Sequence, residues 1–446
     1  MSGPITHREE LRAGERLARD LRHSLALILA GGVGSRLNVL VRQRAKPAVP
    51  FGGIYRLIDF TLSNLINSGL ERVGILTQYL PYSLTDHIGD GRHWGLVGRT
   101  REVRILPPHQ GASGSDWYLG TADAIYRNLG YIHRHDPEFV LLLSGDHVYH
   151  MDYAPMIDAH VRAGADVTIA VRRVPMEQAS DFGTVHVDRD SYIVGFEEKP
   201  AVPTSNLISM GIYVFSARVL VERLMRWTST GAAPDFGHHI FPRMLSGGDR
   251  MFAYEWSGYW EDVGTLRAYF DSHMDLVRAE GALDLSAWRI RTNLDESRVG
   301  DRPPAWIARG AEEDRVLVSR GCRLEGTVTE SILSPGVVIE RGAHVHRSIL
   351  MHDVRIGAGA KLEHAILDKQ VEVGHDARIG FSDDGGRINE RFPTHLDGGL
   401  TVIGKGARVP ERARIGTNVC VFPGSVLRTL GRPTVASGET VGEDSA

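Results

Sequence analysis

The sequence has very little cysteine, no long apolar run and no excess of one charge. Only Cys322 and Cys420 occur in 446 residues, too few for a disulfide framework or a four-cysteine zinc site. The longest apolar runs span about 7 residues, whereas a helix that crosses a bilayer needs about 20. Its 51 basic and 55 acidic residues give a formal net charge of −4. We therefore expect a cytoplasmic protein that binds no membrane and no nucleic acid, with any polyanion held in a local pocket.

Apolar runs alternate with helical patterns over 23–280. The apolar runs lie at 25–29, 73–76, 139–143 and 167–171, and the helical patterns between them include 60–67 and 122–133. This alternation predicts an α/β fold with a mostly parallel, Rossmann-like sheet that is covered on both faces. Ligands of such sheets bind in the loops after the carboxyl ends of the strands. The loops after the first and third runs are therefore the places to look for chemistry.

The pattern changes near residue 305, where a hexapeptide repeat begins. Three hexapeptides make one 18-residue coil of a triangular parallel β-helix, so a 17-residue period is one coil with a shortened corner. The residues six apart are Ile403, Val409, Ile415, Val421 and Leu427. The series 17 apart are Val345, Leu362 and Ile379; Ile339, Ile356 and Val373; and Ile332, Ile349 and Ile366. Cys322 stands one such period before Ile339, which predicts a small buried side chain in an inward register.

These patterns divide the chain into five segments. We expect a charged lead-in helix over 1–22, an α/β catalytic domain over 23–280 and a linker over 281–305. A left-handed parallel β-helix of hexapeptide repeats is expected over 306–430, with a loop at 381–400 that leaves the coil. A mobile polar tail over 431–446 completes the prediction.

A glycine-rich loop follows the first strand in LALILAGGVGSRLNVL. Backbone amides at Gly31, Gly32 and Gly34 can surround phosphate oxygens, and Arg36 can reach a polyphosphate. Leu37 takes the third glycine position of the GxGxxG dinucleotide fingerprint, and no GK[ST] follows. Dehydrogenase and P-loop interpretations therefore lose support.

The next segment, RAKPAVPFGGIYRLIDFTLSNLINSG, is more specific. Together with the glycine-rich loop it resembles the sugar-1-phosphate nucleotidyltransferases, and the resemblance covers about residues 24–430. It implies that ATP and glucose 1-phosphate react directly, giving ADP-glucose for glycogen synthesis and releasing diphosphate. It also implies Mg²⁺, allosteric control by anionic metabolites and a homotetramer.

Two anionic phosphates must meet in such a reaction. At 4 Å each pair of unit charges repels by roughly 4 kcal/mol at an effective dielectric near 20. The attacking oxygen is already an anion, so the protein must supply cations and metal ligands rather than a nucleophile. The resemblance implies Arg36 and Lys46 as the cations and Asp146 and Asp262 as the Mg²⁺ ligands. Asp146 could equally be a helix cap, and Glu261 stands where the family usually has arginine.

The resemblance also implies which residues hold the substrates. Those for glucose 1-phosphate are Tyr118, with Trp117 beside it, Gly183, Glu198, Lys199, Ser209 and Asp235. Those for the nucleotide are Leu29, Ala30, Gly31, Gly32, Gly34, Gln78, Gly120 and Thr121. His238 and His239 are not expected to form a metal pair, because adjacent residues of a helix do not face the same way.

Regulation is expected to involve an anionic effector between the two domains. Arg44 and Arg56 match basic positions that the family uses for this purpose. Gln43 replaces a lysine that fructose-bisphosphate-activated members carry. We therefore expect a different sugar phosphate or a pyruvate-like activator.

Three alternatives remain open from the sequence. A nucleotidyltransferase of this fold could use UTP, dTTP or GTP, since spacing does not determine the base. A non-catalytic regulatory subunit would be marked by loss of Lys46, Asp146 or Lys199, and none is lost. A β-helix acyltransferase would need a projecting histidine, for which the candidates are His344, His346, His352, His364 and His375.

Overall fold

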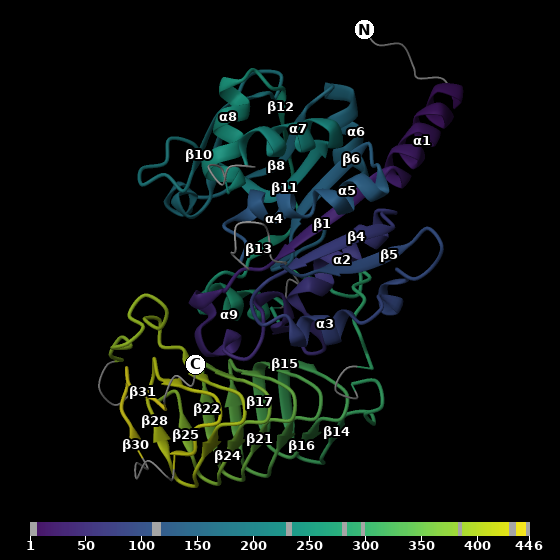
Figure 1. Ribbon diagram of the computed structural model, residues 1–446. Coiled ribbons are helices and arrows are strands. Elements are labelled where there is room, and N and C mark those ends of the chain that lie inside the picture. The colour runs from purple at the N-terminus through teal and green to yellow at the C-terminus, as the bar shows by residue number, and fades with distance from the viewer. Residues whose placement is uncertain are drawn as a thin grey trace.

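The computed structural model describes residues 7–108, 117–228, 234–278, 283–295, 299–381, 386–427 and 434–442. An α/β domain forms the upper part of the molecule and a β-helix the lower part (Figure 1). Helix α9 (Leu266–Asp275) lies between the central sheet and the β-helix. The fold class predicted from the sequence is confirmed.

The upper domain is built on a sheet that has nine strands among the described residues. Seven of them follow the order β10-β9-β11-β6-β1-β4-β5. The other two branch from β11, because β8 pairs with β11 and β12 pairs with β8. Strands β6, β1, β4 and β5 run parallel, whereas β11 is antiparallel to β6 and β8. The strands are β1 (Ser24–Ala30), β4 (Arg72–Thr77), β5 (Glu102–Leu106), β6 (Phe139–Ser144), β8 (Val167–Arg173), β9 (Gly183–Val187), β10 (Ile193–Glu198), β11 (Leu207–Ser216) and β12 (Met251–Glu255). All four predicted apolar runs are strands, because β-branched and leucine side chains suit a sheet that is buried on both faces.

Helices cover both faces of this sheet. They include α2 (Leu57–Asn67), α3 (Tyr82–Ile88), α4 (Thr121–Arg127), α5 (Leu129–His135), α6 (Ala154–Ala163), α7 (Ala217–Trp227) and α8 (Phe241–Ser246). The single helix predicted over 122–133 is wrong. Two helices meet at Asn128, whose side-chain amide donates to the carbonyl of Ala124 and to the Tyr118 hydroxyl. Such local side-chain hydrogen bonds compete with a continuous helix.

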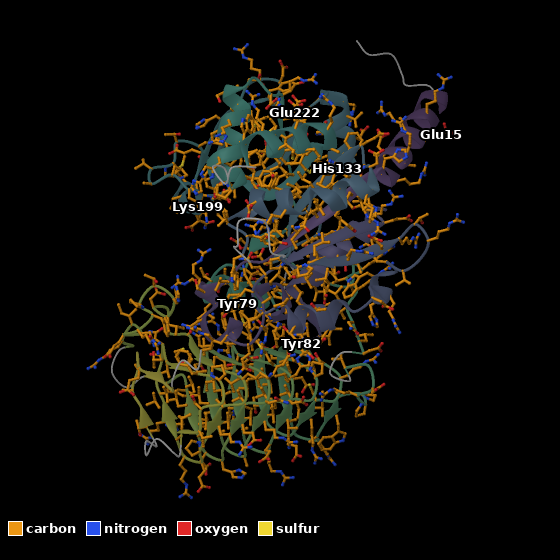
Figure 2. All side chains as sticks on the ribbon, in the orientation of Figure 1. Glu15, Tyr79, Tyr82, His133, Lys199 and Glu222 are labelled. Atoms are coloured by element: carbon orange, nitrogen blue, oxygen red, sulfur yellow. The ribbon has the colours of Figure 1, made fainter. Side chains whose placement is uncertain are left out.

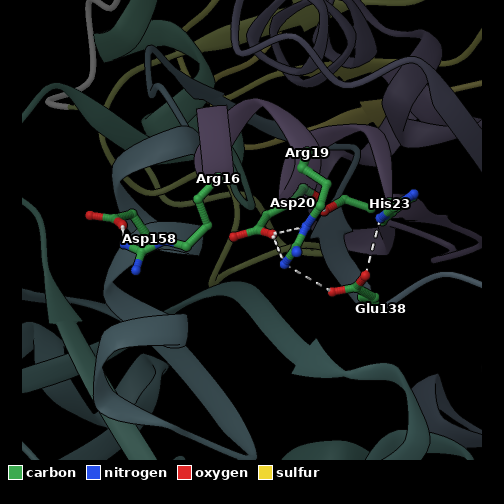
Figure 3. A network of polar contacts seen from close by, with 7 residues as sticks. Arg16, Arg19, Asp20, His23, Glu138 and Asp158 are labelled. Carbon is green, nitrogen blue, oxygen red and sulfur yellow. Dashed lines mark hydrogen bonds and ion pairs between the residues drawn. The ribbon is translucent and has the colours of Figure 1, made fainter. Parts of the chain in front are cut away.

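The N-terminal helix α1 (His7–Arg22) docks on the side away from the β-helix. Arg16 pairs with Asp158 of α6 at 2.9 Å, and Arg19 and His23 both approach Glu138 (Figure 3). These side chains are largely exposed, so each pair contributes at most about 1 kcal/mol. None of the described helices is both long and apolar enough to cross a membrane.

The β-helix has three faces, each made of parallel strands on successive coils. The first face consists of β14 (Trp306–Ile307), β16 (Arg323–Leu324), β18 (Val338–Ile339), β21 (Arg355–Ile356), β24 (Glu372–Val373) and β27 (Arg408–Val409). The second consists of β15 (Glu312–Val318), β17 (Thr327–Leu333), β19 (His344–His346), β22 (Lys361–Glu363), β25 (Arg378–Ile379), β28 (Arg414–Ile415) and β30 (Thr434–Val435). The third consists of β20 (Ile349–Leu350), β23 (Ala365–Leu367), β26 (Thr401–Ile403), β29 (Cys420–Val421) and β31 (Thr440–Val441).

The hexapeptide pattern fills the interior of these coils as predicted. The five residues six apart, from Ile403 to Leu427, are all buried in the β-helix core, and so are two of the three 17-residue series. The third series behaves differently. Ile332, Ile349 and Ile366 face outward against the α/β domain, while the leucine that follows each of them points into the coil. The third face is apolar on both sides because another domain covers it.

The structure corrects two further details of the β-helix prediction. Strands β30 and β31 pair with β28 and β29, so residues 434–442 add another coil where a mobile tail was predicted. The inward residues of this coil, Val435 and Val441, fall out of step with the six-residue series that ends at Leu427, so the repeat gave no signal there.

Cys322 is buried in the core as predicted, but the strand pairing places Leu324, and not Cys322, opposite Ile339. The coil from Leu324 to Ile339 therefore has 15 residues, whereas the coil before it, from Ile307 to Leu324, has 17.

The loop predicted at 381–400 does leave the coil. Residues 386–400 form no strand, and Leu396 and Leu400 pack against the α/β domain. Residues 382–385 lie outside the described ranges, as do 431–433 and 443–446 of the predicted tail.

Candidate active site

A cavity of about 450 Å³ opens at the carboxyl ends of β1, β4 and β6. This is the edge of the sheet at which the sequence analysis placed the chemistry. Its lining residues are Leu29, Gly31, Gly32, Leu76, Gln78, Tyr118, Gly120, Thr121, Ala124, Ser144, Asp146, His147, Glu198, Gly211, Tyr213, Asp235, Phe236 and Gly237.

The glycine-rich loop forms one wall of the cavity. Leu29, Gly31 and Gly32 line it, while Ala30 is buried in the strand end. Gly34 adopts φ +64°, and a Cβ atom there would lie 2.9 Å from the Cβ of Lys46. A glycine at this position therefore lets the loop lie against the RAKPAV segment.

Next to the glycine-rich loop, Lys46 meets the carboxylates of Asp146 and Asp262. The Lys46 Nζ lies 2.8 Å from Asp146 Oδ2 and 3.3 Å from Asp262 Oδ1. A short antiparallel ribbon of β7 (His147–Tyr149) and β13 (Trp260–Asp262) holds the two acids together, with Asp262 directly opposite His147. Three residues far apart in the sequence thus converge on one point.

The charges of this cluster stabilise one another. Burial disfavours a charged ammonium, but Asp146 and Asp262 outweigh it and raise the pKa of Lys46. Burial likewise opposes ionisation of Asp146, but Lys46 and then His147 outweigh it and lower the pKa of that carboxyl. The Lys46 side chain is only 8% exposed, whereas those of Asp146 and Asp262 are 24% and 25% exposed. Asp146 therefore stays ionised, and both acids remain partly open to solvent.

This arrangement fits a divalent cation. The position between the two carboxylates already attracts a cationic group, the Lys46 ammonium. Carboxylate oxygens are the ligands that Mg²⁺ prefers, and it commonly takes only one or two of them together with water and phosphate oxygens. No cluster of three or more histidine, cysteine or acidic ligands occurs among the described residues, so any such ion would depend on its substrate for further ligands.

A second pair of acids lies across the cavity. Gly183 and Gly237 both abut Glu198, and a Cβ at Gly237 would lie 2.3 Å from Glu198 Oε2. Burial raises the pKa of Glu198; Lys199 lowers it and Asp235 raises it further. Asp235 also caps the turn that follows it, accepting a hydrogen bond from the His238 amide at 3.1 Å. Gly183 and Gly237 therefore leave room for the Glu198 carboxylate, which can accept hydrogen bonds from hydroxyl groups.

The wall beneath α4 is built on close backbone contacts. Gly120 packs on Pro234, because a Cβ there would lie 2.4 Å from the Pro234 carbonyl oxygen. The Thr121 hydroxyl donates to Asp235 at 2.8 Å, and the Tyr118 amide donates to Gln78 Oε1 at 2.8 Å. These bonds fix the polar groups that face the cavity.

Several predicted residues stand apart from the cavity lining. Arg36 is exposed, with its guanidinium near Gly264, two residues after Asp262. Lys199 directly follows β10 and is exposed, outside the cavity lining (Figure 2). Ser209 is buried, with its hydroxyl 3.4 Å from that of Tyr213. Trp117 is half-exposed.

Sequence reasoning missed other residues that line the cavity. His147, Tyr213 and Gly237 have no role in the resemblance as stated, although His147 follows Asp146 directly. Tyr213 reaches the cavity because β11 has an irregular register between Ser209 and Tyr213. The signal that could have found it is Gly211, which adopts φ +69° within this strand, because a glycine inside a strand often marks a bulge.

The two predicted effector residues lie deep in the molecule. Arg44 makes a bidentate ion pair with Asp368 of the β-helix, both bonds at 2.9 Å, and the two side chains are 5% and 1% exposed. Arg56 is buried and donates to the Ala48 carbonyl at 2.8 Å. These contacts hold the RAKPAV segment in place and join it to the β-helix.

A second cavity, of about 320 Å³, lies between α9, the β-helix and the 386–400 loop. It is lined by Arg267, Phe270, Asp271, Arg347, His364, His395, Asp397, Gly398 and Leu400. Burial, then Arg347 and Arg267, lower the pKa of His364 to about 4. The lining thus combines two arginines, two aspartates and two histidines, and Arg267 pairs with Asp397 at 3.3 Å.

The histidines considered for an acyltransferase are scattered over the coils. His344 and His346 lie on β19, and His364 lines the second cavity. His352 is buried in the β-helix, and His375 is exposed and lies 3.6 Å from Glu340. They form no common site.

Comparison with known proteins decides the family. The sequence profile described as nucleotidyl transferase matches residues 25–279, which is more than half of the chain. The chain belongs to the nucleotidyl transferase family. A second profile, described as GlmU-like C-terminal hexapeptide, matches residues 303–403.

Nucleotidyl transferases with similar sequences share one name. A glucose-1-phosphate adenylyltransferase of Lachnospira eligens is 46% identical over 91% of this chain and 95% of its own length. Proteins of the same name from Bacillus cereus and Bacillus anthracis are each 48% identical over 73% of this chain and 86% of their own length. The resemblance noted in the sequence is thereby confirmed, and nucleotidyl transferases generally use a divalent metal.

Proposed function

We propose that this nucleotidyl transferase catalyses the glucose-1-phosphate adenylyltransferase reaction, in which ATP and glucose 1-phosphate give ADP-glucose and diphosphate for glycogen synthesis. The observation that carries the proposal is the convergence of Lys46, Asp146 and Asp262 beside the glycine-rich loop. The shared name of relatives 46–48% identical to the chain supports the choice of substrates.

In this proposal, amides at Gly31 and Gly32 bind triphosphate oxygens, and Arg36 approaches them from the loop rim. Asp146 and Asp262 would hold a Mg²⁺ ion, which would neutralise charge on the phosphates. Lys46 then turns its ammonium toward the reacting phosphates. These groups align the two substrates. A phosphate oxygen of glucose 1-phosphate then attacks the α-phosphate of ATP, and diphosphate leaves on the opposite side.

The remaining cavity residues divide between the two substrates. We assign the nucleotide to the wall of Gln78, Gly120 and Thr121, where backbone groups and an amide can read a base. The glucose hydroxyls are assigned to Glu198 and Asp235, with Lys199 at the rim for the sugar phosphate. Tyr118, Gly183 and Ser209 shape this side of the cavity.

A release assay for diphosphate tests the proposal. Glucose 1-phosphate is offered with ATP, UTP, dTTP or GTP in turn, with and without Mg²⁺. The proposal expects rapid release with ATP alone among the four and none without the metal. Preference for another base would overturn the adenylyl assignment, and no release with any triphosphate would favour a non-catalytic subunit.

Regulation is proposed at the second cavity. Arg347 supplies positive charge there, Arg267 can exchange its exposed partner Asp397 for an anion, and His395 Nδ1 is buried with no hydrogen-bond partner among the described residues. His395 lines this cavity, and burial and then the charge of Arg36 lower its pKa. An anionic metabolite that binds here could therefore shift Arg36.

Initial rates with inorganic phosphate, fructose 6-phosphate or pyruvate test the effector site. We expect at least one of them to change the rate about fivefold, and the change to disappear in Arg347→Ala. An Arg341→Ala control, at an exposed corner of the coil, keeps the response. A response that survives Arg347→Ala, or none with any metabolite, contradicts this site.

We also propose, as an extension of the same assignment, that the protein acts in the cytoplasm as a homotetramer. Sedimentation mass at working concentration tests the assembly.

A further inference from the structure

One histidine of the active-site cavity has no role in the assignments made so far. His147 lies on β7, directly opposite Asp262 of β13, and lines the cavity. The residue is only 9% exposed. Its ring packs edge-on against Trp260, with the ring centroids 5.2 Å apart, and Gly211 of β11 borders its Cε1 atom. These neighbours hold the imidazole in one orientation.

The two ring nitrogens of His147 have different surroundings. Nδ1 is buried and has no hydrogen-bond partner among the described residues. Nε2 faces the two acids and lies 3.7 Å from Asp146 Oδ1 and 3.8 Å from Asp262 Oδ1. Both distances are too long for a hydrogen bond. Nε2 is therefore within reach of a ligand oxygen that binds beside these carboxylates.

The sealed Nδ1 atom determines where the neutral ring carries its proton. A proton on Nδ1 would be a buried donor without an acceptor, whereas a buried acceptor without a donor is tolerated more often. We therefore place the proton on Nε2. Burying polar atoms that stay unbonded costs free energy, and an apolar ring could pack against Trp260 without that cost. A packing role alone therefore does not account for a histidine here.

The position of His147 favours the sugar substrate over the nucleotide. The nucleotide is assigned to the glycine-rich loop and to the wall that carries Gln78 and Gly120, whereas His147 borders Gly211 on β11. The same strand carries Ser209, which belongs to the sugar side of the cavity. A substrate oxygen that comes from this side and reaches both Nε2 and the acids belongs to the phosphate of glucose 1-phosphate.

We propose that His147 is a catalytic residue that binds glucose 1-phosphate, with the Nε2–H group donating a hydrogen bond to a phosphate oxygen of the sugar substrate. This inference rests on the proposed function and adds a contact to the attacking group. A donor that is held in one orientation can align the attacking phosphate with the α-phosphate of ATP. His147 thus joins the acid pair to the sugar side of the cavity.

Three substitutions at His147 separate a donor at the Nε2 position from simple packing. His147→Gln places an amide near the Nε2 position, His147→Asn places one near the sealed Nδ1 position, and His147→Ala removes both nitrogens. His133→Ala, at an exposed residue of α5 (Figure 2), is the control. Circular dichroism verifies that every variant folds.

Calorimetry measures binding without turnover. The protein is saturated with Mg²⁺ and an ATP analogue that has a methylene bridge between its α- and β-phosphates, and glucose 1-phosphate is then titrated in. A separate titration gives Kd for the analogue. Diphosphate release with ATP is measured on the same samples.

We expect His147→Ala and His147→Asn to raise Kd for glucose 1-phosphate about twentyfold, because a hydrogen bond to a charged group is lost. Kd for the analogue should not change, and His147→Gln and His133→Ala should bind glucose 1-phosphate nearly as well as the wild type. Unchanged binding in His147→Ala, an equal loss for the analogue, or a Gln variant no better than the Asn variant would overturn the inference alone.

Two results for the wild type bear on the proposed function itself. A wild-type protein that binds glucose 1-phosphate through His147 but releases no diphosphate would overturn the proposed function and leave this inference standing. A wild-type protein that binds no glucose 1-phosphate would overturn both.

Discussion

Two basic residues only two positions apart join the RAKPAV segment to different regions of the molecule. Arg44 pairs with Asp368 where the domains meet, at 2.9 Å and with both side chains sealed from solvent. Lys46 pairs with Asp146 and Asp262 at the cavity, where the acids remain about one quarter exposed. The sealed pair can only hold the domains together. In the open pair, the acids can exchange Lys46 for a metal ion, and Lys46 can exchange the acids for a phosphate. This accessibility distinguishes a catalytic ion pair from a structural one.

Removing the charge at the open pair should give the largest effect. Asp146→Asn is expected to lower kcat by about a thousandfold or more, because a metal ligand and a negative charge are lost together. Thermal unfolding should stay cooperative with only a modest loss of stability, because Lys46 keeps Asp262 as a partner. Asp190→Asn, in the exposed turn before β10, is the matched control and keeps wild-type turnover. Near-normal turnover in Asp146→Asn would remove this carboxylate from the mechanism.

Breaking the sealed pair should act on stability instead. Arg44→Ala leaves Asp368 buried and unpaired, so we expect a loss of about 3–5 kcal/mol in the free energy of unfolding. The double variant Arg44→Met with Asp368→Leu replaces the pair by apolar contacts and should regain most of that stability. Urea unfolding followed by fluorescence measures both. A single variant as stable as the wild type would show that the pair does not join the domains.

A smaller effect, on substrate binding, is expected at Gly237, where the lack of a side chain leaves room for Glu198. Gly237→Ala places a Cβ atom against the Glu198 carboxylate, which must then move. We expect KM for glucose 1-phosphate to rise about tenfold, or about 1.4 kcal/mol, with little change in KM for ATP. Gly130→Ala in α5 adds a Cβ in open space and is the control. Equal rises in both KM values would contradict a sugar-specific role.

The smallest effect is a pH dependence of the free energy of unfolding that arises from the buried residue His273. His273 accepts a hydrogen bond from the Gly52 amide, and burial lowers its pKa to about 3. The unfolded chain binds a proton near pH 6.5 while the folded protein does not, so stability must fall as pH drops below 6.5. Between pH 7 and 5.5 the loss should be about 1 kcal/mol. His273→Gln should remove this part of the pH dependence in urea unfolding, and an unchanged slope would contradict the assignment.

The sequence predicts the site better than it predicts the contact between the domains. Gly31, Asp146 and Gln78 all follow parallel strands, so one topological rule brings them to the same edge of the sheet. Arg44 could not be assigned in this way, because its partner lies 324 residues away and no local pattern links them. The same holds for Ile332, Ile349 and Ile366, since a repeat period fixes a position on the coil but not whether another domain covers it.

The most direct test of the account is a crystal structure with ATP and Mg²⁺. The account predicts a triphosphate against the loop from Gly31 to Arg36, a metal ion held by Asp146 and Asp262, and a Lys46 ammonium that has moved from the acids to the phosphates. A triphosphate bound elsewhere, or a Lys46 still lodged between the two carboxylates with the nucleotide in place, would contradict it.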